Sequence, residues 1–141
     1  MVSVVARIVA AALGALGLLH VYWALGGRRG AAAAVPEVGG QRAFVPSKSA
    51  TLVVAGALLF AALVTAVAGR LIRVGGFDFV FRFLAFGLSA TFIARAVGDF
   101  RLVGFFKRSR ETRFARLDTA VFSPLCFAVG CAIFYVAYRA A

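Results

Sequence analysis

Apolar residues dominate four stretches of the chain, and polar residues gather between them. Each stretch is about twenty residues long, the four covering residues 8–26, 50–69, 77–97 and 119–138. A helix rises about 1.5 Å per residue, so each stretch matches the roughly 30 Å hydrocarbon core of a bilayer. A helix of a soluble bundle would carry polar residues along one face, whereas only Thr51 and Thr65 interrupt the second stretch. The pattern predicts an all-α fold, a polytopic membrane protein built as one bundle of four transmembrane helices.

The composition supports this interpretation. Hydrophobic residues make up 63% of the 141 residues, and the mean hydropathy is +0.97. Soluble domains carry about 45–50% apolar residues, and a chain of this length forms a single domain. Such a domain is too small to bury four largely apolar helices, so lipid must cover them. The first stretch differs from a secretory leader because its apolar run is long and only Arg7 precedes it, and we interpret it as a retained span.

The distribution of charge predicts the orientation. The formal net charge is +11, and the segments 27–49 and 98–118 hold ten of the sixteen Lys and Arg residues. Basic residues collect in cytoplasmic loops of membrane proteins. We therefore expect a multi-pass protein of the bacterial inner, or plasma, membrane with both basic loops in the cytoplasm and both termini outside. The charge then serves topology and attraction to anionic lipid, and no nucleic-acid partner is expected.

The only histidine, His20, lies eight residues before Arg28 and therefore about 12 Å into the first span. Gly17 and Ala24 share its helical face, and small residues on a face indicate contact with another helix. Two interpretations stay open, namely a structural hydrogen bond between spans and a role in binding a ligand or handling a proton.

The remaining candidate ligands do not predict a metal or a cofactor. There is no second histidine, and both cysteines, Cys126 and Cys131, fall in the fourth span. Five residues apart on a helix, they point about 140° away from each other and form no C-x-x-C motif. We expect no metal, no cofactor and no thiol redox chemistry, with both cysteines serving as packing residues.

The third span contains two arginines, Arg82 and Arg95. Asp78 precedes Arg82 by four residues, and Asp99 follows Arg95 by four, so each carboxylate shares a helical face with its arginine. The spacing predicts two intrahelical ion pairs that lower the free energy of insertion.

Polar residues gather at the cytoplasmic ends of all four predicted spans. This predicts a polar pocket beneath the phenylalanine-rich segment 98–118, with positive charge suited to a phosphate or carboxylate head group. The predicted ligand-binding residues are His20, Trp23, Arg95, Asp99, Arg101, Asp118 and Ser123.

Four blocks of sequence resemble a known family. They are HVYWALGG at residues 20–27, FVPS at 44–47, VGDFRLVGFFKR at 97–108 and FARLDTAVFSPLC at 114–126. The chain is similar over its whole length to domain-of-unknown-function family 3995, a family of small bacterial membrane proteins. The resemblance implies four spans and implies no established activity, substrate or catalytic residue. Phe122 stands where the family commonly carries tyrosine, so this chain lacks a hydroxyl there.

Several functions remain open at this point. The first is binding of a membrane lipid, in particular an anionic one, or of another anionic amphiphile. The main alternative is an accessory or structural subunit of a membrane complex, joined through small-residue faces to a second copy or another membrane protein. A small enzyme using His20 with Asp99 or Asp118 for acid–base work is a further alternative, as is a dimeric transporter. No nucleophile motif is present, and no catalytic residue is predicted.

Overall fold

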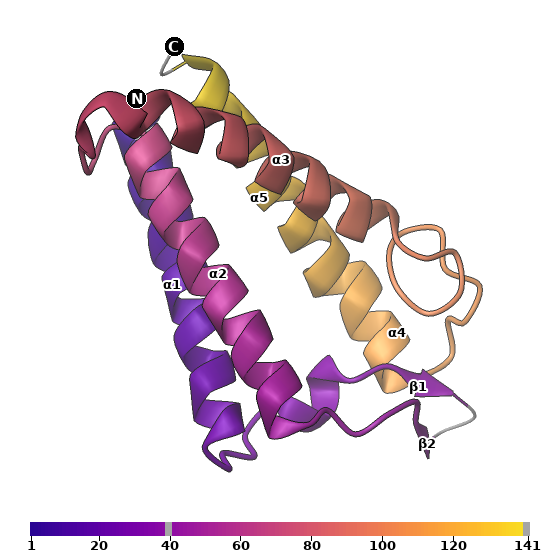
Figure 1. The fold of residues 1–141 in the computed structure, drawn as a ribbon. Helices are drawn as coiled ribbons and strands as arrows, with labels where there is room; N and C mark the ends of the chain where they lie inside the picture. Colours follow the sequence, from indigo (N-terminus) through magenta and orange to yellow (C-terminus); the bar gives the residue numbers. More distant parts are fainter. Residues whose placement is uncertain (39–40, 140–141) are drawn as a thin grey trace.

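The computed structural model describes residues 1–38 and 41–139, which form a helical bundle (Figure 1). The long helices are α1 (Val2–Ala24), α2 (Lys48–Ala68), α3 (Asp78–Val97) and α5 (Ser123–Arg139). The shorter elements are a 3-10 turn (Ala31–Ala34), the antiparallel strands β1 (Glu37–Val38) and β2 (Gln41–Arg42), a second 3-10 turn (Gly75–Phe77), α4 (Arg113–Leu117) and a π-helical turn (Asp118–Phe122). Four helical segments within the described residues are long and apolar enough to cross a membrane. This confirms the predicted all-α bundle, although the fourth segment begins earlier than expected, at Arg113.

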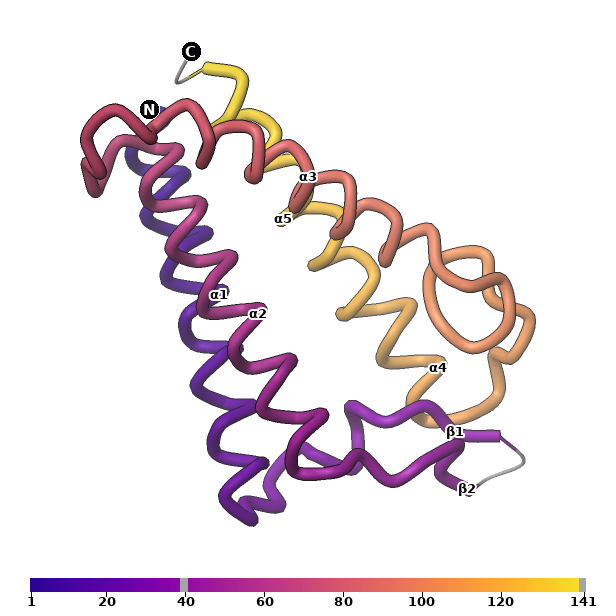
Figure 2. Tube along the Cα trace, viewed as in Figure 1, coloured from indigo at the N-terminus to yellow at the C-terminus, as the bar shows by residue number. Residues whose placement is uncertain are grey.

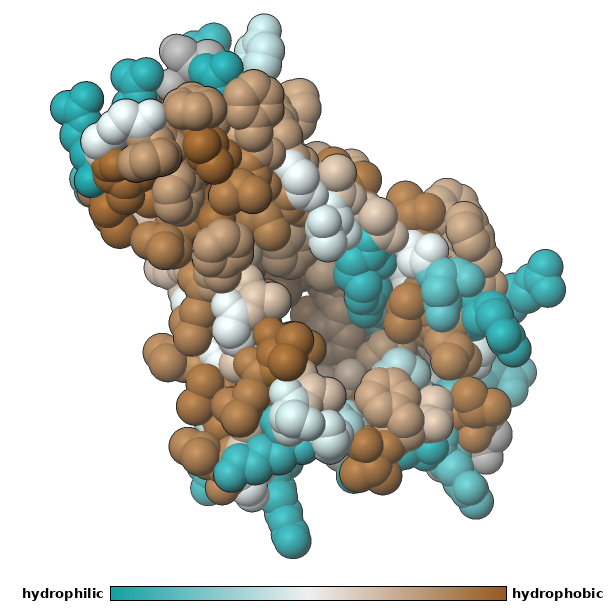
Figure 3. Space-filling model, in the orientation of Figure 1, coloured by the Kyte–Doolittle hydropathy of each residue, from teal (hydrophilic) through white to brown (hydrophobic). Residues whose placement is uncertain are grey.

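The helices form two hairpins that diverge. α1 packs along α2 and α3 packs along α5, and the hairpins meet where α1 begins and α5 ends (Figures 1 and 2). Toward the opposite end they separate, and the space-filling view shows a hollow between them (Figure 3). At that end the 3-10 turn at Ala31–Ala34 and β1 contact α4, so the loop between α1 and α2 bridges the two hairpins.

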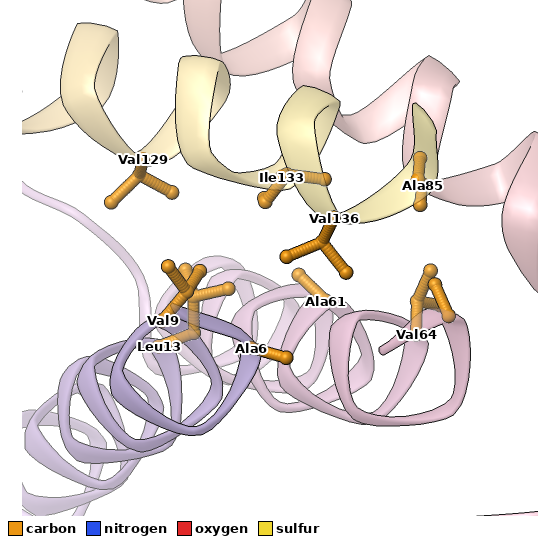
Figure 4. Close-up of a cluster of buried hydrophobic side chains, with 11 residues drawn as sticks. Ala6, Val9, Leu13, Ala61, Val64, Ala85, Val129, Ile133 and Val136 are labelled. Atoms are coloured by element: carbon orange, nitrogen blue, oxygen red, sulfur yellow. The ribbon is translucent and has the colours of Figure 1, made fainter. Parts of the chain in front are cut away.

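The apolar core lies where the hairpins meet (Figure 4). Leu13, Val64 and Ile133 are completely buried there, together with Ala6 and Ala85. Small residues allow the backbones to approach closely. A Cβ added to Gly69 would overlap that of Ala6, and one added to Gly17 would lie 2.8 Å from the side chain of Leu59 on α2.

Large apolar side chains cover the outside of the helices. More than half of the maximal surface is exposed for each of Leu18, Val53, Phe83 and Phe79. Apolar groups lie across the middle of the visible face, and hydrophilic groups gather toward its ends (Figure 3). A soluble monomer does not expose apolar surface on this scale, so the pattern is that of a multi-pass membrane protein.

Two local sequence signals fix the ends of helices at the loop side. The Ser47 side chain accepts a hydrogen bond from the backbone N–H of Ala50 at 3.1 Å and thereby caps the start of α2. At the start of α5, Pro124 has no N–H to donate to the carbonyl four residues earlier, and the preceding residues form a π turn. The backbone N–H of Ser123 donates to the carbonyl of Asp118 five residues earlier, which places both side chains on one side of the helix.

Candidate functional site

A buried carboxylate, Asp118, organises the loop end of the α3–α5 hairpin. It has no exposed surface and accepts four hydrogen bonds from side chains and backbone. Its Oδ1 accepts from Arg95 Nη2 at 2.8 Å. Its Oδ2 accepts from Gly104 N at 2.8 Å, from Lys107 Nζ at 2.9 Å and from Ser123 Oγ at 3.0 Å. The carboxylate therefore joins α3, α5 and the loop between them.

Lys107 is the second buried charge of this cluster, with its side chain 1% exposed. Besides Asp118, its ammonium donates to Gly104 O at 2.9 Å and to Thr119 Oγ1 at 2.6 Å. An ammonium has three hydrogens, so all of its donors are used. Sequence reasoning missed this residue, although one signal was present, since Lys107 is one of only two lysines beside fourteen arginines.

The loop after α3 closes into a compact ring. Gly98 and Gly104 have φ angles of +95° and +89°, which favour glycine. A Cβ added to either glycine would overlap backbone atoms on the opposite side of the ring. Asp99 Oδ1 accepts hydrogen bonds from the backbone N–H groups of Arg101, Leu102 and Val103 at 2.8 to 3.0 Å. These donors, the N–H of Val103 foremost, hold the pKa of Asp99 below its usual range.

The two ion pairs expected within the third span do not form. α3 ends at Val97, and the left-handed turn at Gly98 carries Asp99 off the helical face that it was expected to share with Arg95. Arg95 pairs with Asp118 instead. Asp78 Oδ1 accepts from the backbone N–H of Val74 at 3.1 Å, and the described residues include no ion pair between Asp78 and Arg82.

A separate cavity of about 350 Å³, here called the apolar pocket, lies at the loop end of the α1–α2 hairpin. Residues of both helices and of the loop that joins them form its wall. The lining residues are His20, Trp23, Gly27, Ala31, Ala34, Val35, Arg42, Phe44, Val45, Pro46, Ala50, Thr51 and Val54. The loop and the two helices thereby line a mostly apolar pocket that is open on one side.

His20 and Trp23 contact each other in the wall of the apolar pocket. Their ring centroids lie 4.7 Å apart at an interplanar angle of 62°. Trp23 Nε1 donates to the carbonyl of Arg29 at 2.8 Å, which fixes the indole beneath the loop. His20 Nδ1 lies 2.8 Å from the carbonyl of Leu16 in its own helix, and the described residues include no hydrogen bond from His20 to another span. Because a carbonyl only accepts, Nδ1 is the donor of this hydrogen bond.

A second cavity of about 370 Å³, here called the basic cavity, adjoins the apolar pocket. It shares Gly27, Ala31 and Arg42 with that pocket and adds Arg28 to the lining. Both arginines are exposed. The mostly apolar pocket thus adjoins a cavity bordered by two guanidinium groups.

The structure separates the predicted ligand-binding residues into three places. His20 and Trp23 line the apolar pocket. Arg95, Asp118 and Ser123 belong to the buried polar cluster, and Asp99 and Arg101 lie on the exposed loop ring. The divergence of the hairpins keeps these places apart. Arg28, Arg42 and Phe44 were not predicted, since periodicity does not reveal how a loop folds back over a helix end.

The described residues contain no group of three or more His, Cys, Asp or Glu side chains arranged to hold a metal ion. The arrangement that they do contain combines a rigid polar cluster on one hairpin with an amphipathic pair of cavities on the other.

Comparison with known proteins gives a family but no activity. No curated protein and no solved structure matches the chain significantly. A family model described as "Protein of unknown function (DUF3995)" matches residues 13–133, which include both cavities and the polar cluster. The chain belongs to the DUF3995 family.

Proposed function

We propose that the protein binds an anionic amphiphile, with the apolar tail in the apolar pocket and the charged head group at Arg28 and Arg42. The observation that carries the proposal is the adjacency of the two cavities, which share the lining residues Gly27, Ala31 and Arg42. A ligand that occupies both must be apolar at one end and anionic at the other.

The dimensions and chemistry of the apolar pocket support this proposal. Its volume of about 350 Å³ falls within the range of small-molecule sites, roughly 300–1,000 Å³. Trp23, Val35 and Phe44 contribute apolar surface, while Thr51 already donates its hydroxyl to the carbonyl of Ser47 at 2.9 Å. His20 Nε2 has no hydrogen-bond partner within the described residues, so it remains for a polar group of the ligand.

The basic cavity supplies the complement to a phosphate or carboxylate. Guanidinium groups bind such oxyanions in bidentate geometry, and hydrogen bonds between charged groups are about twice as strong as those between neutral groups. Arg28 and Arg42 form no ion pair within the described residues, so their charges are available to a head group.

The location of the site follows from the proposed orientation. The excess of basic residues in segments 27–49 and 98–118 supports a bacterial plasma-membrane protein with these loops in the cytoplasm and both termini outside. The site would then lie at the cytoplasmic leaflet, whose anionic lipids attract basic segments. The polar cluster around Asp118 takes a positioning role in this proposal, because its carboxylate and the Lys107 ammonium are saturated by internal partners.

Native mass spectrometry of the protein in a mild detergent tests the proposal. The wild type is compared with Arg28→Gln/Arg42→Gln and with Arg101→Gln/Arg108→Gln, a control that removes the same charge from exposed positions outside both cavities. We expect a retained small mass in the wild type and the control, and at least a tenfold lower occupancy in the first variant. Equal occupancy in both variants, or no retained mass at all, would contradict the proposal.

A further inference from the structure

A third cavity, here called the turn pocket, lies at the end of the bundle opposite the proposed amphiphile site. Its volume is about 290 Å³, and its lining residues come from the end of α2, the start of α3 and the turn between them. Figure 1 shows that turn beside the N-terminus. The wall of the turn pocket combines a short apolar surface with four charged side chains. The lining includes Val67, Phe79, Arg70, Arg73, Asp78 and Arg82. Three cations and one anion thus face a single pocket.

The single carboxylate does not neutralise the nearest arginine. Asp78 Oδ1 is engaged by the backbone N–H of Val74 at 3.1 Å, and the predicted ion pair with Arg82 is absent. Within the described residues, neither Arg73 nor Arg82 forms an ion pair. The pocket therefore keeps a positive charge.

Arg82 supplies the most specific feature of the turn pocket. Its Nε is buried and has no hydrogen-bond partner among the described residues. Burying a donor without an acceptor costs free energy of desolvation, and this cost is larger for a charged guanidinium than for a neutral group. Arg82 lies only four residues after the start of the membrane-spanning helix at Asp78. Its long side chain can therefore extend to the depth of the lipid phosphates. An oxyanion in the pocket would accept from Nε and offset the convergence of like charges.

We propose that the turn pocket binds a phosphate group through Arg82 and Arg73. Phosphate offers several acceptor oxygens to guanidinium donors, and the pocket admits either a lipid head group or a free phosphate ion. This site lies at the opposite end of the helices from Arg28 and Arg42, so it does not depend on the proposed amphiphile site. In the proposed orientation it faces the outer leaflet.

The test measures two probes on the full-length protein. Inorganic phosphate is titrated calorimetrically into protein in a neutral detergent. Phosphatidylglycerol is counted by native mass spectrometry against phosphatidylcholine. Saturable binding of inorganic phosphate that Arg82→Gln weakens identifies a free-anion site in the turn pocket. Retention of phosphatidylglycerol alone, weakened by Arg82→Gln, identifies a lipid head-group site there. Binding of neither probe would overturn the proposal.

The variants are Arg82→Gln and Arg73→Gln, with Arg7→Gln as the matched control. Arg7 is exposed, lies on α1 at the same end of the bundle and does not line the turn pocket. We expect Arg82→Gln to weaken binding at least tenfold and Arg7→Gln to leave it unchanged. Arg73 is exposed, so Arg73→Gln is expected to fold and provides the test if Arg82→Gln does not fold. We expect Arg73→Gln to weaken binding of the probe severalfold. Equal loss in the pocket variants and in Arg7→Gln would show general charge attraction and overturn the proposal.

Discussion

Replacing Asp118 by asparagine is expected to destabilise the loop end of the α3–α5 hairpin strongly. The carboxylate accepts four hydrogen bonds, two of them from the cations of Arg95 and Lys107. Asparagine keeps one acceptor oxygen and turns two N–H donors toward groups that are themselves donors. The Lys107 ammonium, 1% exposed, would lose its counter-charge while staying buried.

The magnitude follows from burial. Removing one partner of a buried ion pair costs about 3–5 kcal/mol because the other charge is left uncompensated. Arg95→Gln provides the contrast, since the Arg95 side chain is 35% exposed and Asp118 keeps its pair with Lys107. A partly exposed pair contributes about 1 kcal/mol or less. We therefore expect Asp118→Asn to lower the free energy of unfolding by at least about 2 kcal/mol more than Arg95→Gln does.

The assay is equilibrium unfolding by sodium dodecyl sulfate in mixed micelles, followed by far-ultraviolet circular dichroism. The double variant Lys107→Met/Asp118→Leu removes both buried charges and is expected to recover part of the stability that Asp118→Asn loses. An Asp118→Asn protein that unfolds within about 0.5 kcal/mol of the wild type would refute the assignment of a structural ion pair. Equal losses for Asp118→Asn and Arg95→Gln would refute the importance of burial.

Three further outcomes are expected. Gly104→Ala should open the ring after α3 and lower the free energy of unfolding by about 2 kcal/mol or more. The reason is that φ is +89° at this residue and a Cβ would overlap the backbone of Gly98. Faster proteolysis of the loop would measure the opening. Gly17→Leu should separate α1 from α2, because even a Cβ at this position would lie 2.8 Å from the Leu59 side chain. We expect a lower melting temperature, while hydrogen exchange shows that the α3–α5 hairpin stays intact. The lowered pKa of Asp99 means that its stabilisation is complete above about pH 4, the ordinary range of aspartate, and is lost as the pH falls through the folded value. The amide proton shifts of Leu102 and Val103 should therefore titrate below pH 4, and a midpoint above it would contradict the bonding to Asp99.

The sequence predicted the elements well because the relevant physics is local. Apolar runs of about twenty residues marked the four helices, because that is the length needed to cross a bilayer. The prediction of an ion pair between Arg95 and Asp99 was wrong because of a single residue between them. Gly98 ends α3 in a left-handed conformation, so a rule for helical neighbours no longer applied.

The candidate site was harder to predict because it depends on how separate segments meet. Helical spacing placed His20 on an inward face, but it did not reveal that the hairpins diverge and leave His20 and Asp118 in different environments. Lys107 lies in a loop without periodicity, and only its rarity as a lysine distinguished it. Arg28 and Arg42 joined the site through a loop that folds back over the helix ends.

The central claim is that an anionic amphiphile occupies the apolar pocket, and Trp23 provides the most direct test. It is the only tryptophan in the chain and lies in the pocket wall, so its fluorescence reports on that site alone. The measurement is quenching by phosphatidylglycerol with brominated acyl chains, titrated into protein in neutral detergent micelles, beside the equivalent phosphatidylcholine. The account predicts saturable quenching by phosphatidylglycerol that Arg28→Gln/Arg42→Gln weakens at least tenfold. Quenching that does not saturate, and that is equal for both lipids and both proteins, would show contact with bulk lipid and contradict the account.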